Sequence, residues 1–70
     1  MPDDAAALTE KIKKSEHAGD LVKTYKPPQR PTDEQTRELY NAAVRMWNTL
    51  TAKEKELVIE NFYFPNLQEL

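Results

Sequence analysis

The chain has 70 residues, of which 31% are charged, with a formal net charge of −2 and no cysteine. A chain this short forms one domain at most, and it usually needs a staple, a metal or a partner to be comfortably stable. The lack of cysteine excludes disulfides and cysteine-based metal sites, and a single histidine and a single glycine exclude zinc fingers and glycine-rich phosphate loops.

Hydropathy and charge narrow the class of protein further. The longest apolar run is far shorter than the roughly 20 residues that a membrane span needs, and the acidic N-terminal segment lacks a signal-peptide pattern. We therefore expect a soluble intracellular, cytoplasmic chain. Up to Pro31, five acidic residues face six basic ones, whereas from Thr32 onward seven acidic residues face four basic ones. This acidic C-terminal part argues against a nucleic acid as its partner.

The first predicted helix occupies residues 4–18. Asp3 or Asp4 can cap its start, and Gly19 is well placed to end it in a left-handed conformation. Its apolar stripe is thin, because Leu8 and Ile12 are its only large apolar residues.

The segment after Gly19 can add one short turn, which carries Leu21, Val22 and Tyr25. Residues 1–25 contain too few large apolar side chains to fold alone. We therefore expect an N-terminal helix or arm, which either packs on the C-terminal half or lies on another protein.

Residues 26–31 form a proline-rich connector. Three prolines in five residues exclude a helix or a central strand and favour extended polyproline geometry. The connector also contains a PxxP match, but Asp33 stands where an SH3 ligand needs a flanking basic residue. A stiff spacer is therefore the preferred interpretation over a docking motif.

Two capping boxes mark the helices of the C-terminal part, residues 32–70. The first pairs Thr32 with Gln35, and the second pairs Thr51 with Glu54 almost without an intervening loop. The two helices should therefore meet at a tight corner near Thr51. The sequence predicts an all-α chain of about three helices with a proline-rich connector, the helices covering roughly residues 4–18, 33–49 and 52–63.

Large apolar residues are concentrated in this C-terminal helix pair. Two helices cannot bury so many between themselves, and each aromatic side chain alone can bury on the order of 150–250 Å². Exposed apolar patches usually mark partner surfaces, so we expect this part to dock on a larger protein or on a second copy of the chain. The residues predicted for this interface are Trp47, Leu50, Val58, Ile59, Asn61, Phe62, Tyr63 and Phe64.

Residues 45–62, "RMWNTLTAKEKELVIENF", resemble the C-terminal catalase-related helical segment of haem catalases, and residues 33–62 resemble it more loosely. The shared pattern is an aromatic at Trp47, a Thr at Thr51, a Glu/Lys run, an apolar pair and then Glu60-Asn61. The chain departs from that family after Asn61, where "YFPNLQEL" replaces a glycine-containing turn. The catalytic residues and haem ligand of catalases lie in their barrel domain, so no catalytic residue is carried over. The resemblance implies a packing helix pair at the edge of a larger enzyme.

Candidate chemical sites have simpler interpretations. His17 beside Glu16 or Asp20 resembles a general base, but a histidine near a helix C-terminus is more often solvated there. The acidic residues Asp33, Glu34 and Glu38 suggest a metal cluster or, more simply, charges that suit the start of a helix. No nucleophile–base–orienter set can be assembled, so we predict no catalytic residue, no cofactor and no metal.

Three functional hypotheses follow. The preferred one is a small non-catalytic helical module, such as a subunit, adaptor or regulator, that docks through its apolar C-terminal surface. The alternative is a fragment or accessory helical segment of a catalase-like haem enzyme. The third is a nucleic-acid binder, although its basic residues lack interleaved aromatics. Those basic residues are Lys11, Lys13, Lys14, Lys23 and Lys26.

Overall fold

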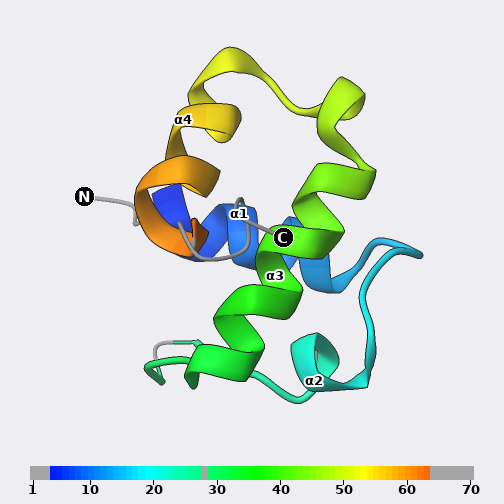
Figure 1. The fold of residues 1–70 in the computed structure, drawn as a ribbon, viewed down its shortest axis with the longest axis vertical. Helices are drawn as coiled ribbons and strands as arrows, with labels where there is room; N and C mark the ends of the chain where they lie inside the picture. The colour runs from blue at the N-terminus through cyan, green and yellow to red at the C-terminus, as the bar shows by residue number, and fades with distance from the viewer. Residues whose placement is uncertain (1–3, 28, 64–70) are drawn as a thin grey trace.

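The computed structural model describes residues 4–27 and 29–63, and this part of the chain contains four α-helices, one 3-10 turn and no strand. The predicted all-α fold with three longer helices is confirmed. Figure 1 shows α3 and α4 forming the front of the molecule, with α1 crossing behind them and α2 beside α3. The elements are α1 (Asp4–Lys13), α2 (Asp20–Lys23), α3 (Asp33–Arg45), the 3-10 turn η1 (Trp47–Thr49) and α4 (Ala52–Phe62).

Helix α1 ends at Lys13, five residues before the predicted boundary. Ser15 explains the early end. Its hydroxyl donates to the Ile12 carbonyl oxygen at 2.7 Å and accepts from the backbone N–H of His17 at 3.3 Å. These local hydrogen bonds offer the backbone an alternative to a further helical turn, as serine side chains often do.

Gly19 does not end α1, and its backbone is not left-handed. Its φ of −84° and ψ of 179° are extended, and it is the N-cap of the short helix α2. The prediction of a left-handed cap at Gly19 is therefore wrong, because Ser15 has already ended α1. The short turn expected after Gly19 does form as α2.

Both predicted capping boxes are present. The Thr32 hydroxyl accepts from the Gln35 N–H at 3.1 Å, and the Gln35 side chain accepts from the Thr32 N–H at 3.0 Å. Thr51 and Glu54 make the same reciprocal pair at 3.1 and 2.9 Å. The expected tight corner near Thr51 is thus confirmed, although α3 ends at Arg45 and tightens into η1 before Leu50.

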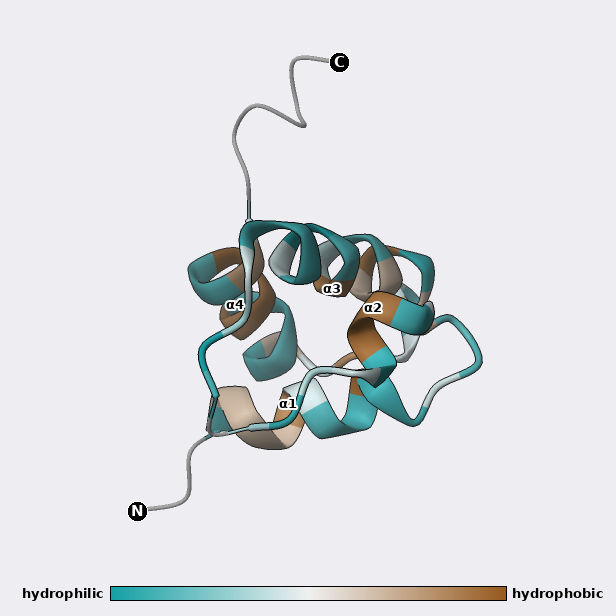
Figure 2. Cartoon of the chain, turned by 90° about the horizontal axis from the view of Figure 1, so that it is seen from below, coloured by the Kyte–Doolittle hydropathy of each residue, from teal (hydrophilic) through white to brown (hydrophobic). Residues whose placement is uncertain are grey.

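One hydrophobic core joins all four helices, with Leu8, Ile12 and Val22 from the N-terminal part packed in the same cluster as Leu39 and Val58. Figure 2 shows the apolar stretches of the helices turned largely toward the middle of the molecule. Residues 1–25 had two expected arrangements, packed or lying on another protein. The described part of this segment packs on the C-terminal helices.

Two polar contacts tie the N-terminal part to the C-terminal helices. Lys11 Nζ on α1 lies 3.0 Å from Glu54 Oε1 on α4, and Gln35 Nε2 on α3 donates to the Leu21 carbonyl oxygen on α2 at 3.2 Å. The pKa of Glu54 is lowered from its usual value of 4.5, first by the hydrogen bond from the Thr51 backbone N–H and then by Lys11. These contacts fix how α1 and α2 sit against the helix pair.

Within the described residues, no helix is long and apolar enough to cross a membrane.

Candidate functional site

The outer face of the α3–α4 pair carries a row of aromatic and aliphatic side chains with one lysine, which we call the outer seam. Its members come from the two antiparallel helices and the turn between them. On the first helix and η1 they recur at spacings of four and three, and on the second at spacings of four, so each set lies along one helix face. The outer seam consists of Tyr40, Val44, Trp47, Lys55, Ile59 and Tyr63.

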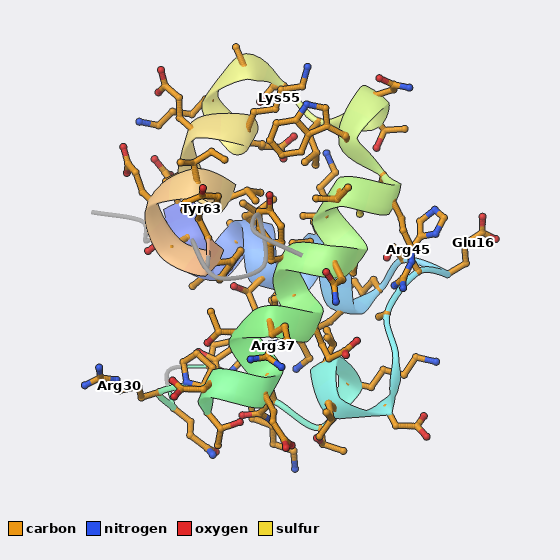
Figure 3. The ribbon with its side chains drawn as sticks, in the orientation of Figure 1. Glu16, Arg30, Arg37, Arg45, Lys55 and Tyr63 are labelled. Atoms are coloured by element: carbon orange, nitrogen blue, oxygen red, sulfur yellow. The ribbon has the colours of Figure 1, made fainter. Side chains whose placement is uncertain are left out.

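Two contacts across the seam show how the helices are aligned. The rings of Tyr40 and Tyr63 meet edge to face, with their centroids 5.8 Å apart, at one end. Lys55 Nζ lies over the Trp47 ring, 5.7 Å from its centroid, at the other. Both geometries are attractive, the first between ring edge and ring face and the second between cation and π-electrons. Figure 3 shows Tyr63 and Lys55 near opposite ends of α4.

The middle of the seam exposes apolar surface. Val44 and Ile59 are each 47% exposed, and Tyr63 is 37% exposed. The residues one position before the first two, Ala43 and Val58, are fully buried. One residue turns a helix by about 100°, so this single step separates the core face from the outer face.

The structure divides the eight residues predicted for an interface. Leu50, Val58 and Phe62 lie in the core, with exposed fractions of 6%, 0% and 4%, so in this fold they offer little surface to a partner. Trp47 is half-buried against the core, whereas Ile59 and Tyr63 are exposed. Asn61 is exposed, and its amide donates to the Leu57 carbonyl oxygen at 2.8 Å. Phe64 lies outside the described residues.

Sequence reasoning left two members of the seam, Tyr40 and Val44, out of the interface. From the sequence alone, the apolar stripe of this helix consists of Leu39, Ala43, Met46, Trp47 and Leu50, and Tyr40 and Val44 only widen it. A second stripe, displaced from the first by one residue, was the signal that could have identified them, because it runs 40, 44, 47 with helical spacing.

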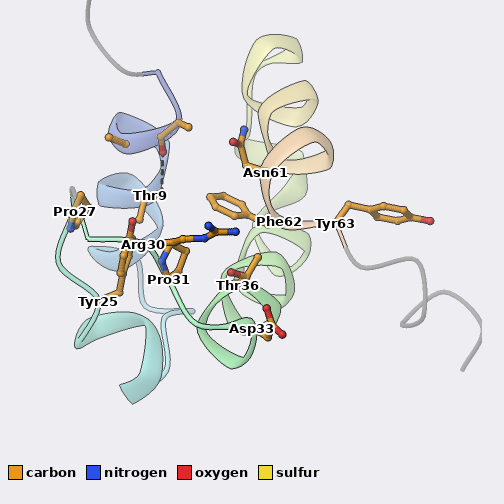
Figure 4. A pocket seen from close by; sticks show the side chains of 12 residues that line it. Thr9, Tyr25, Pro27, Arg30, Pro31, Asp33, Thr36, Asn61, Phe62 and Tyr63 are labelled. Carbon is orange, nitrogen blue, oxygen red and sulfur yellow. Dashed lines mark hydrogen bonds between the residues drawn. The ribbon is translucent and has the colours of Figure 1, made fainter.

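A groove of about 630 Å³ opens on another side of the molecule, where the start of α1, the connector, the start of α3 and the end of α4 meet. Figure 4 shows Arg30 reaching toward Phe62 and Thr36 across it. Its threonine and asparagine side chains already bond to backbone, Asn61 to the Leu57 carbonyl oxygen as described above. Thr9 and Thr36 donate to the Ala5 and Thr32 carbonyl oxygens at 2.8 and 2.9 Å. The described lining therefore presents no set of groups poised for chemistry.

The candidate base His17 also has no activated partner among the described residues. Its Nε2 is 4.0 Å from Glu16 Oε1, and the Glu16 side chain is 89% exposed. Ser15 is nearby in sequence, but its hydroxyl hydrogen is directed to the Ile12 carbonyl oxygen and not to the imidazole. Among the described residues, no three His, Cys, Asp or Glu side chains gather to hold a metal ion.

Comparisons of this chain with family models, with curated proteins and with solved structures find no match. The resemblance of residues 45–62 to the catalase-related region stays a prediction, and so does the alternative that the chain serves a haem enzyme. A Soret band that co-purifies with the chain would support that alternative.

Proposed function

We propose that this chain is a small non-catalytic helical interaction module that docks on another protein, or on a second copy of itself, through the outer seam. The observation that supports it is the exposure of Val44 on α3, of Ile59 on α4 and of Tyr63 directly after α4 in a very small fold. Exposed apolar patches often mark sites of protein–protein interaction.

The physical reason is the free energy of removing apolar surface from water, about 25 cal/mol per Å². In the chain alone, the exposed apolar surface of Val44 and Ile59 stays in water. A partner that covers the middle of the seam would bury this surface, and the gain in free energy would favour association. Aromatic residues are enriched at protein interfaces, because they present large, rigid apolar surface with a polar edge. Tyr40, Trp47 and Tyr63 have this character.

The substitution Ile59→Asp tests the proposal, with Leu21→Asp as its matched control. Ile59 and Leu21 are 47% and 41% exposed and both are helical, but Leu21 lies on α2, away from the seam. We expect Ile59→Asp to reduce the fluorescence of bound ANS and to weaken association, whereas Leu21→Asp leaves both nearly unchanged. Each substitution should change the free energy of unfolding by less than about 0.5 kcal/mol, because the sites are on the surface.

Sedimentation and ANS titration of the unsubstituted chain complete the test. A chain that stays strictly monomeric at high concentration and binds no ANS would contradict the proposed function. Equal losses in the two Asp variants would show that the seam has no special role.

A further inference from the structure

We draw no further inference here: the strongest candidate, the groove between the start of α1, the connector, the start of α3 and the end of α4, carries both a cation, Arg30, and a carboxylate, Asp33, in its described lining, so that its charge selects no ligand, and nothing in the structure shows what covers it.

Discussion

Gln35 holds two parts of the chain together through opposite ends of one amide. Its Oε1 accepts from the Thr32 N–H as part of the capping box, and its Nε2 donates to the Leu21 carbonyl oxygen at 3.2 Å. The side chain is buried, with 8% of its surface exposed. The residue therefore begins α3 and also fastens α2 to it.

The substitution Gln35→Glu separates these two roles. Glutamate keeps the acceptor that the capping box needs, but at neutral pH it loses the donor and faces the Leu21 carbonyl oxygen with a carboxylate. We expect the free energy of unfolding to fall by about 1–2 kcal/mol at pH 7, measured by urea titration. The loss should shrink in acid, where the protonated carboxyl becomes a donor again. No loss at pH 7 would show that the contact with Leu21 contributes nothing.

Glu54 makes the corresponding pair of contacts at the start of α4, with Lys11 as its distant partner. Its pKa is lowered by the Thr51 backbone N–H and by Lys11, so the folded state favours the carboxylate. The stability from this preference is present above the usual pKa of 4.5 and is lost as the pH falls through the lower pKa of the folded state.

Glu54→Gln should reveal this dependence on pH. Glutamine can keep the box acceptor but not the charge, so we expect a cost of about 0.5 kcal/mol at pH 7, typical of a partly exposed ion pair. The difference between the two proteins should vanish in acid, as the wild-type carboxylate becomes protonated. Urea titrations at pH 7 and at a series of lower pH values measure it, and a difference that does not shrink as the pH falls would contradict the ionic explanation.

At the scale of the element, α3 presents two different faces to its surroundings. Leu39 is fully buried in the core, whereas Val44 is 47% exposed on the outer seam. Both faces have helical spacing and apolar members, and they are displaced by one residue. One face of the helix therefore packs in the core, and the other is exposed at the proposed interface.

Truncation to alanine distinguishes these faces. Leu39→Ala should lower the free energy of unfolding by about 2–5 kcal/mol, because it removes buried methyl groups and leaves a cavity. Val44→Ala should change it by less than about 0.5 kcal/mol at concentrations where the chain is monomeric. Thermal unfolding followed by circular dichroism compares them. A large loss from Val44→Ala in the monomer would place this side chain in the core.

At the scale of the whole molecule, the N-terminal helix completes the core. Leu8 and Ile12 are 2% and 0% exposed, and α1 packs against both α3 and α4. The C-terminal pair alone would therefore leave apolar surface open where α1 now lies. A chain of this size buries only a small core, so the remaining helices are not expected to stay folded when one of them is lost. We therefore expect the four helices to unfold in a single cooperative transition.

The substitution Ile12→Ala in α1 tests whether the four helices unfold together, because the fluorescence of Trp47 reports on η1, a different element. We expect a loss of about 2–5 kcal/mol in the free energy of unfolding, seen equally by circular dichroism and by the fluorescence of Trp47 in η1. If α1 were an independent arm, the Trp47 transition would not move. Glu10→Ala, on the half-exposed side of α1, serves as the control and should have little effect.

Residues close together in the sequence set where the C-terminal helices begin and where they meet. Thr32 with Gln35 and Thr51 with Glu54 find their partners only three residues away, so their hydrogen bonds form with any packing of the helices. Local chemistry also ended α1, but through Ser15, whose hydroxyl competed with the helix earlier than Gly19. The end of α1 is therefore encoded locally, by Ser15 and not by Gly19.

Which apolar residues face inward, by contrast, depends on how the helices pack in three dimensions. Leu50, Val58 and Phe62 were expected at an interface, yet they are buried in the core cluster, because α1 packs on both α3 and α4. Val44 and Ile59 remain outside because one residue along a helix turns the side chain by about 100°. Burial depends on partners distant in sequence, such as Ile12 and Val58 in the same core cluster, and local spacing does not encode their positions.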